Sequence, residues 1–364
     1  SATVSEKDIT AALEVYDAIT VSVAEVSGAN SYTVELPAKI FVLADSSKSI
    51  EIETEVGTIT VPGNMFIEAE IKDAEKVSFK IATADTSELD KSVQELVGSR
   101  PVIELIAFVD GKIIEWNNPD VLVSVSIPYN PTVEELMDPE HIVVGYIDNN
   151  GLIKVVPSGR YNAGTGRVTF TTSHFSKYAV AFVHKTFDDI SEYPWAQKAI
   201  EVLASKGVIA GTSPTTYSPT AHITRADFLV LLTKTMGLTA KVDSNFKDIP
   251  ADAYYYEAVG IAKKLGITHG VGNDMFAPNE KISRQDMFAL IHRAMVIAGK
   301  DLEEGNISDI SMYDDVEQIA PYAVDSIAAL VKNGLVVGHN NKLTPKANTT
   351  RAEAAVLLYK LYYK

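Results

Sequence analysis

Cysteine is absent from all 364 residues of the sequence. The chain therefore has no disulfide framework, no thiol nucleophile and no thiolate metal site. It also lacks any run of about 18 apolar residues, which excludes a membrane-spanning helix. The chain begins at Ser1 without a methionine or a signal peptide. We therefore expect it to be a processed or excised piece of a longer protein.

The sequence also lacks the common catalytic and metal-binding patterns. Its seven histidines show no H-x-x-x-H spacing, and there is no nucleophile elbow, P-loop or dinucleotide-binding glycine pattern. Asp148 to Gly151 lacks the further acids of a calcium loop and is better explained as a hairpin turn. We therefore predict no metal, no cofactor and no enzymatic activity. A pair of carboxylates for glycoside hydrolysis stays open, because acids are abundant.

The negative charge is concentrated in the first half of the chain. Residues 1–185 hold 27 acids and 14 bases, and residues 186–364 hold 21 acids and 18 bases, which gives net charges of −13 and −3. An acidic chain of this kind is a poor partner for nucleic acid. The second half is close to neutral.

The first half consists of short runs in which apolar and polar residues alternate, such as SIEIETEV and KVSFKIAT. Alternation of this period, rich in Val, Ile and Thr and broken by Gly, Pro, Asn and Asp, predicts antiparallel strands. Asp110-Gly111 and Asn150-Gly151 predict two hairpin turns. Residues 1–185 are therefore predicted to form an all-β, sandwich-like region, either one sandwich or two small ones in tandem, that acts as a spacer or assembly module.

The second half consists of three similar units of helix, loop and helix, at residues 186–240, 241–305 and 306–364. The second unit matches the first at a constant offset of 59 residues over more than 40 positions. One helix pair cannot bury both of its apolar stripes, so we expect the three units to pack as a single helical core. Glycines where the first helix of each unit must end predict left-handed C-caps. They are Gly207, Gly266 and Gly334.

A hydroxyl residue, an arginine and an acid recur ahead of the second helix of each unit. They are Thr224, Arg225 and Asp227, then Ser283, Arg284 and Asp286, then Thr350, Arg351 and Glu353. This spacing predicts a capping box or its Asp variant, in which the hydroxyl accepts from the N3 amide and the acid reaches back to the N-cap amide.

The capping pattern does not explain the arginine. A cation at the first helical position meets the positive end of the helix dipole, at a cost of about 0.3–1 kcal/mol. Three such arginines need a compensating anion. It is either internal, such as the acids that open each unit, or an external ligand held by the guanidinium together with free helix amides. The opening acids are Asp189, Asp248 and Asp315.

These features occur in one register and resemble the S-layer homology (SLH) domain, present as a complete set of three over residues 186–364. The resemblance implies an all-α, pseudo-threefold helical bundle that holds secondary cell wall polysaccharide, commonly bearing a pyruvylated amino sugar, without covalent linkage. It implies that Arg225, Arg284 and Arg351 contact the pyruvate carboxylate. It also implies helix-one aromatics near the ligand, although a core role is equally compatible with them, and glycines that let sugar approach the loop backbone. These residues are Trp195, Tyr254, Tyr322, Gly211, Gly270 and Gly338.

The resemblance leads to three hypotheses about function. The first is a non-catalytic anchor that attaches a surface protein of S-layer type to the bacterial cell wall, outside the cell, with peptidoglycan-linked polymer as its partner and S-layer self-assembly as a further role. The second makes the β region a wall-displayed carbohydrate-binding or glycoside-hydrolysing module, which exposed aromatics in a cleft would favour. The third is a protein-binding adhesin, which a large exposed apolar patch would favour. We expect the first.

Overall fold

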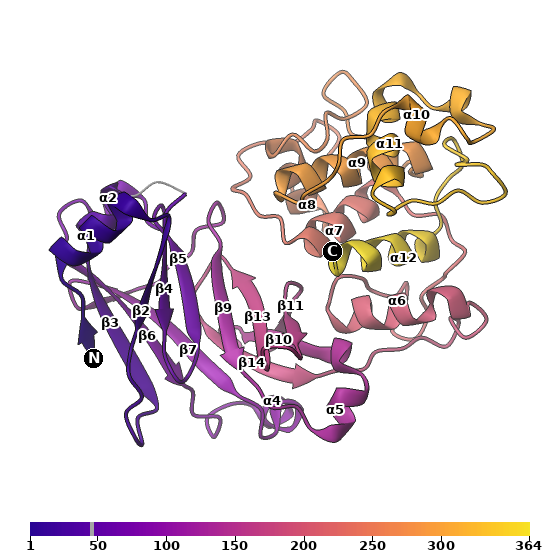
Figure 1. The fold of residues 1–364 in the computed structure, drawn as a ribbon. Coiled ribbons are helices and arrows are strands. Elements are labelled where there is room, and N and C mark those ends of the chain that lie inside the picture. Colours follow the sequence, from indigo (N-terminus) through magenta and orange to yellow (C-terminus); the bar gives the residue numbers. More distant parts are fainter. Residues whose placement is uncertain (44–46) are drawn as a thin grey trace. The chain divides into compact units, whose positions relative to one another are not determined.

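A computed structural model describes residues 1–43 and 47–364 of the chain (Figure 1). The chain divides into two compact units, Ser1–Val183 and His184–Lys364. Within the described residues no helix combines the length and the apolar character needed to cross a membrane. The two units are described separately below.

The first unit contains two sheets that share one core. The larger sheet has the strand order β1-β3-β6-β7-β14-β10-β11, with β8 paired to β7, and the smaller has the order β12-β13-β9-β5-β4-β2. The larger sheet comprises β1 Ala2–Thr3, β3 Ser31–Pro37, β6 Lys76–Thr83, β7 Val102–Val109, β8 Lys112–Ile114, β10 Ile142–Ile147, β11 Ile153–Val156 and β14 Lys177–Phe182. The smaller comprises β2 Ala18–Ser22, β4 Ser49–Glu53, β5 Thr58–Pro62, β9 Val123–Pro128, β12 Arg160–Asn162 and β13 Arg167–Thr172.

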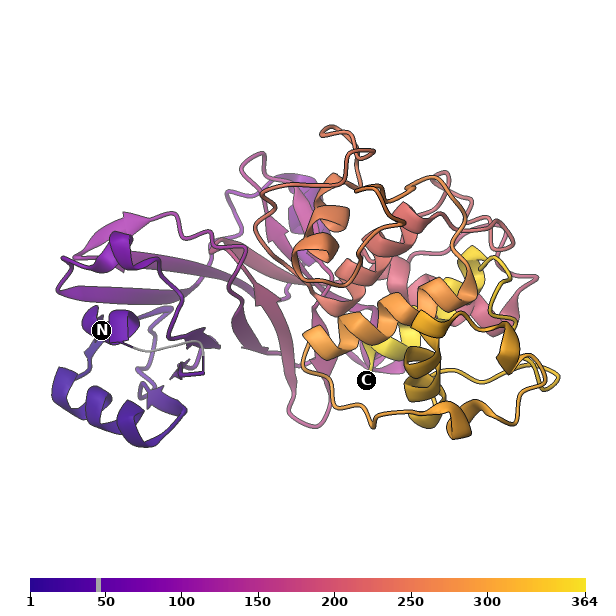
Figure 2. The ribbon, with the colours of Figure 1, turned by 90° about the horizontal axis from the view of Figure 1, so that it is seen from above.

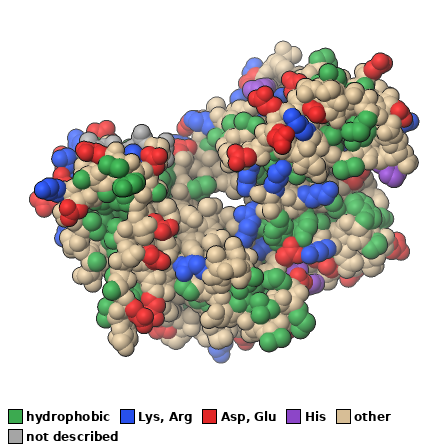
Figure 3. Space-filling view, in the orientation of Figure 1, with side chains coloured by type: hydrophobic (Ala, Val, Ile, Leu, Met, Phe, Trp, Pro, Cys, Tyr) green, Lys and Arg blue, Asp and Glu red, His purple; other side chains and the backbone are tan. Residues whose placement is uncertain are grey.

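Alternation along the strands places the core as the sequence predicts. In β9, Val123, Val125 and Ile127 are buried while the residues between them are not. The predicted hairpin turn at Asp110-Gly111 is confirmed: it joins β7 to β8, and both residues have positive φ, at 47° and 76°, as a type I′ turn requires. Acidic side chains are spread over the face of this unit that Figure 3 shows, in keeping with its net negative charge.

The prediction of an all-β first half is wrong, because this unit also contains helices. The strands are also not all antiparallel as predicted, because β1 pairs with β3 and β2 with β4 in parallel. The helices are α1 Glu6–Val15, α2 Lys39–Leu43, α3 Glu68–Ile71, α4 Lys91–Val97 and α5 Val133–Met137. Of these, α2, α3 and α5 have five residues or fewer, too few for the helical period to stand out between strands. The helices still bury apolar side chains, such as Val93 and Val97 of α4, which pack on the larger sheet. Of the residues that the structure describes, 31% are helical and 24% are in strands.

The second unit gathers its helices around one core that runs through all three repeats. Figures 1 and 2 show the helices from two directions. Each repeat contributes two helices, α6 Pro194–Ser205 and α7 Arg225–Met236, α8 Tyr256–Lys264 and α9 Arg284–Ile297, and α11 Val324–Lys332 and α12 Arg351–Tyr362. The first helix of each repeat packs on the second helix of another, α6 on α12, α8 on α7 and α11 on α9. Short turns complete the third repeat, at α10 Ile307–Ile310, Val316–Gln318 and Pro321–Ala323. The predicted left-handed C-cap glycines are confirmed, with φ of 68°, 74° and 70° at Gly207, Gly266 and Gly334.

The prediction that this unit is an all-α bundle is also wrong, because backbone pairing of β type joins the segments ahead of α7, α9 and α12. Ile223 N donates to Thr349 O, Thr349 N donates to Ile282 O, and Ile282 N donates to Ile223 O, at 3.0–3.1 Å, which closes a ring. Bridges flank the ring between Thr224 and Lys281 and between Ser283 and Asn348. This ring could not be predicted from the sequence, because its three residues lie in different repeats. Helical periodicity describes single segments and does not indicate which segments pair.

The ring predicts a stabilising substitution at Thr349. This residue occupies the place that isoleucine has at positions 223 and 282, it is fully buried, and its hydroxyl has no hydrogen-bond partner among the described residues. Thr349→Val keeps the shape and removes the unsatisfied group, so we expect the free energy of unfolding of the second unit to rise by about 1 kcal/mol. Calorimetric melting of the full chain measures the change. A lower melting temperature would show that the hydroxyl has a partner.

Candidate functional site

The recurring hydroxyl residues cap the second helix of each repeat. Thr224, Ser283 and Thr350 accept a hydrogen bond from the backbone N–H three residues on, at 3.1–3.2 Å. Only Glu353 also reaches back to the N-cap amide, at 2.8 Å from Thr350 N. Aspartate is one methylene shorter, and Asp227 instead accepts from the Thr224 hydroxyl at 2.7 Å. We call the four residues that begin each of these segments the tetrad: Thr224–Asp227, Ser283–Asp286 and Thr350–Glu353. The acid of the tetrad therefore makes different contacts in different repeats.

The first two amides of each of these helices are already paired. They donate to carbonyl oxygens of the loop in the neighbouring repeat, at 2.8–3.1 Å. The pairs are Arg225 N to Glu280 O, Ala226 N to Pro278 O, Arg284 N to Ala347 O, Gln285 N to Pro345 O, Arg351 N to Ala221 O and Ala352 N to Pro219 O. With the third amide on the N-cap hydroxyl, these helix starts offer no free N–H to an anion. An external anion at this place would depend on the guanidinium.

Each tetrad arginine reaches across to the loop of the neighbouring repeat. Its Nε donates to a backbone carbonyl there, and its guanidinium lies 4.6–5.3 Å from the centroid of an aromatic ring. Arg225 Nε bonds Phe276 O at 3.0 Å, Arg284 Nε bonds Leu343 O at 3.0 Å and Arg351 Nε bonds Tyr217 O at 2.8 Å. The rings are those of Phe276, Phe288 and Tyr217, respectively. We call these three assemblies the Arg225, Arg284 and Arg351 clusters.

Two of the three arginines have an internal anion. Arg225 Nη1 lies 3.4 Å from Asp286 Oδ2, and Arg284 Nη1 lies 3.3 Å from Glu353 Oε1. The partner is thus the acid of the next tetrad, which the sequence did not indicate. Arg351 differs, because its Nη2 donates to Ala210 O at 2.7 Å and no carboxylate among the described residues lies within the 4.0 Å of an ion pair.

The acids that open each repeat hold the loops instead of the arginines. Each carboxylate accepts two backbone N–H groups of the loop, at 2.7–2.9 Å. Asp189 binds Tyr217 and Ser218, Asp248 binds Phe276 and Ala277, and Asp315 binds Leu343 and Thr344. Their suggested pairing with the tetrad arginines is therefore not found. They fix the residue whose carbonyl the arginine holds.

The aromatics expected on the first helices lie at the surface, but only Trp195 is in such a helix, α6, whereas Tyr254 and Tyr322 lie in the turns just ahead of α8 and α11. Trp195, Tyr254 and Tyr322 are 58%, 74% and 52% exposed. The Tyr254 hydroxyl donates to Asp227, and the Tyr322 hydroxyl donates to Asp286. Partial burial and the Asp286 carboxylate raise the pKa of Tyr322 to about 12, so this hydroxyl keeps its proton at neutral pH. The core explanation left open for these rings does not apply, and their faces are available to a ligand.

The second glycine of each repeat is required by packing. A Cβ at Gly211, Gly270 or Gly338 would come within 2.3–2.8 Å of the loop backbone and the aromatic ring that opens the repeat. Those rings belong to Phe187, Phe246 and Tyr313. The absence of a side chain therefore lets ring and loop pack, which is a sufficient reason for glycine here.

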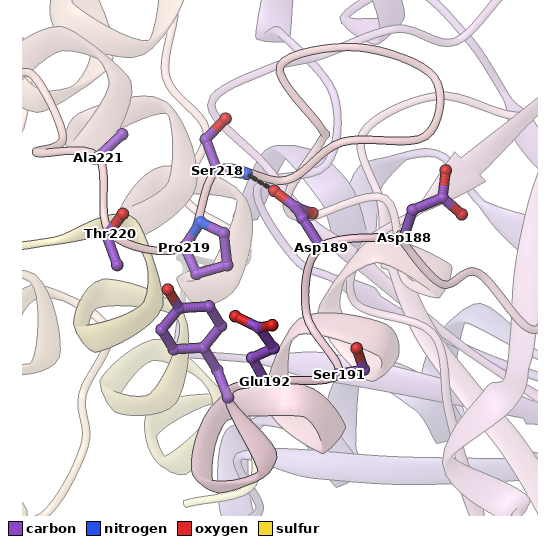
Figure 4. A pocket seen from close by; sticks show the side chains of 9 residues that line it. Asp188, Asp189, Ser191, Glu192, Ser218, Pro219, Thr220 and Ala221 are labelled. Atoms are coloured by element: carbon purple, nitrogen blue, oxygen red, sulfur yellow. Dashed lines mark hydrogen bonds between the residues drawn. The ribbon is translucent and has the colours of Figure 1, made fainter.

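A pocket of about 500 Å³ adjoins the loop of the first repeat (Figure 4). It is lined by Asp188 and Asp189 on one side and by Ser218, Pro219 and Thr220 on the other. Figure 4 shows Asp189 facing the Ser218 amide, to which it is bonded at 2.7 Å. Tyr217, whose ring lies under the Arg351 guanidinium, directly precedes Ser218, the first of the loop residues that line the pocket.

The first unit has a pocket of its own, of about 760 Å³, where β8 separates from β14 beside β7. Glu104 and Glu115 line it together with Trp116 and Tyr146. Trp116 is only 5% exposed and donates its indole N–H to Met65 O, and Tyr146 packs edge-on against His174 at 4.8 Å. These rings contact protein neighbours, whereas the carbohydrate-binding hypothesis for this unit needs exposed aromatic faces.

Sequence reasoning missed the carbonyl groups of Tyr217, Phe276 and Leu343, which organise the three clusters. Their signal was the aromatic or apolar residue two positions before a proline in each repeat. It also missed that each cluster draws on more than one repeat, since Arg351 and Tyr217 are 134 residues apart.

Comparison with known proteins matches the S-layer homology domain at residues 186–229, 245–288 and 313–355. The surface-layer 125 kDa protein of Lysinibacillus sphaericus is 31% identical over 202 residues, 54% of this chain and 16% of its own length. The S-layer protein of Bacillus licheniformis is 32% identical over 180 residues, 48% of this chain and 20% of its length.

A third relative, the amylopullulanase of Thermoanaerobacterium thermosulfurigenes, is 30% identical over 324 residues, 88% of this chain and 16% of its length. That match is longer than the second unit, so it includes part of the first. The chain thus spans about a sixth to a fifth of the length of these relatives. The three matched segments fall on the three repeats described above, each containing one tetrad arginine. The chain is therefore a cell-wall-associated surface protein that carries a triplet of S-layer homology domains, the module that anchors proteins to the cell wall.

Proposed function

We propose that the second unit anchors the chain by binding pyruvylated secondary cell wall polysaccharide at the tetrad arginines, without covalent linkage. The observation that carries this proposal is that every repeat has a guanidinium stacked on a ring and, separately, a surface aromatic in or just ahead of its first helix. A guanidinium suits the carboxylate of a pyruvyl group, and an exposed ring face suits a sugar.

Charge supports the same proposal. The second half has almost as many bases as acids, so its net charge repels an anionic ligand only weakly. The first half has about twice as many acids as bases and would repel such a ligand more strongly. The first unit has its own core, and residues 1–185 carry a net charge of −13; in this proposal the unit serves as a spacer or assembly module that the second unit holds at the wall.

Replacing Arg225, Arg284 and Arg351 together by alanine should abolish sedimentation of the full chain with purified cell walls, because the three guanidinium contacts are removed. A triple variant of exposed lysines, K281Q/K300Q/K346Q, removes the same net charge from the same unit and should still sediment. Cooperative melting of both variants shows that the unit is folded.

Stripping pyruvate from the walls tests the recognised group directly. We expect unmodified chain to lose its sedimentation with such walls. Undiminished binding would show that the carboxylate is not what the arginines hold, and retained binding by the folded arginine variant would refute the assignment of these residues.

A further inference from the structure

The three arginine clusters are chemically unequal. Arg225 and Arg284 each face a carboxylate of the neighbouring tetrad, whereas Arg351 has no carboxylate within ion-pair distance in the part of the chain that the structure describes. Arg225 is also buried, at 8% exposure, while Arg351 is partly exposed. An incoming anion at the first two clusters meets a guanidinium whose charge is already balanced and an acid that repels it.

The difference arises from how the tetrad acids are used. Asp227 is the tetrad acid that the order of the repeats would pair with Arg351, as Asp286 pairs with Arg225, but each of its oxygens accepts from another side chain. One accepts from the Thr224 hydroxyl at 2.7 Å and the other from the Tyr254 hydroxyl. Asp286 accepts from Tyr322 with one oxygen and keeps the other for Arg225.

Tyr254, whose hydroxyl donates to Asp227, supplies an exposed aromatic ring. Its ring is 74% exposed. Partial burial and the Asp227 carboxylate raise the pKa of Tyr254, and the positive charge of Arg351 acts against that rise. This cluster therefore combines an unbalanced cation with an open aromatic face.

We infer that Arg351 is the primary contact for the anionic group of the wall polymer. Arg225 and Arg284 act mainly by forming ion pairs that hold neighbouring repeats together. This inference rests on the proposed function, since it selects among the arginines named there. It assigns the specificity for a carboxylate-bearing sugar to a single cluster, built from Arg351, Tyr217, Asp227 and Tyr254.

The test is calorimetric titration of the full chain with purified pyruvylated wall polymer. R351Q should weaken binding about 10- to 100-fold, the effect of losing a charge-assisted contact to a carboxylate. R225Q and R284Q should change the affinity less than about threefold, while lowering the melting temperature of the second unit through loss of these ion pairs.

D286N provides an independent arm if R351Q folds poorly. It preserves the size of the side chain and the acceptor for Tyr322 but leaves Arg225 without its carboxylate, so a second anion site should appear as a higher polymer stoichiometry or affinity. The inference is overturned if D286N binds as the unmodified chain does, or if R284Q loses binding while R351Q retains it. Failure of the unmodified chain to bind the polymer would instead refute the proposed function itself, before any variant is compared.

Discussion

Replacing Glu135 by glutamine is expected to lower the free energy of unfolding of the first unit by about 3 kcal/mol. Glu135 is 1% exposed and accepts three hydrogen bonds, from Arg100 Nε at 2.6 Å, Tyr129 OH at 2.7 Å and Thr132 N at 2.7 Å. The amide removes the charge and turns one acceptor into a donor, leaving Arg100 without its counter-ion. Urea unfolding followed by the fluorescence of Trp116, which is buried in this unit, measures the loss.

Glu134 is the matched control for this substitution. It precedes Glu135 in α5 but is exposed and forms no buried pair, so E134Q should change stability by less than about 0.5 kcal/mol. Equal effects of the two variants would contradict the assignment of a buried charge network and point to helix charge alone.

The same carboxylate predicts a dependence on pH. Burial by itself raises the pKa of Glu135, but the hydrogen bonds from Tyr129, Thr132 and Arg100 together hold it below its ordinary value. A group whose pKa is lowered on folding stabilises the folded state above its unfolded pKa and loses that contribution as the pH falls. The first unit of the unmodified chain should therefore weaken below about pH 4.5, and E135Q should remove part of that dependence.

The features that could be predicted from the sequence were those that depend on residue periodicity, on local turn and capping patterns and on the repeats. Alternation placed Val123, Val125 and Ile127 in the core, Asp110-Gly111 marked a hairpin, and the spacing of Thr224 and Asp227 marked a helix start. Each of these depends on residues within a few positions of one another, where local sterics and backbone hydrogen bonding decide the outcome. The repeat register likewise identified the arginines as residues at equivalent positions, each at the start of the second helix of its repeat.

Contacts between repeats were beyond prediction from the sequence. The partner of Arg225 is 61 residues away and that of Arg284 is 69 residues away, because each helix start packs against the loop of another repeat. The ring of Ile223, Ile282 and Thr349 has the same origin. Period and propensity describe one segment at a time, so they show that an arginine needs an anion without showing which one.

Replacing Asp315 by asparagine is expected to lower the free energy of unfolding of the second unit by about 3 kcal/mol. Asp315 is 5% exposed, and its two oxygens accept from Leu343 N at 2.9 Å and Thr344 N at 2.7 Å. The asparagine amide can satisfy one of these N–H groups but opposes the other with a donor. Asp314 is exposed and adjacent in sequence, so D314N is the matched control and should be close to neutral.

The effect of D315N should also reach the arginine that depends on this loop. Leu343 contributes its N–H to Asp315 and its carbonyl to Arg284, so loosening the first contact loosens the second. Calorimetric melting should show D315N and R284Q each lowering the transition of the second unit, with the double variant less destabilised than the sum of the two. Strict additivity would mean that Arg284 holds the Leu343 carbonyl independently of Asp315. A non-additive result would show that the opening acid of the repeat supports the arginine by fixing the carbonyl it binds.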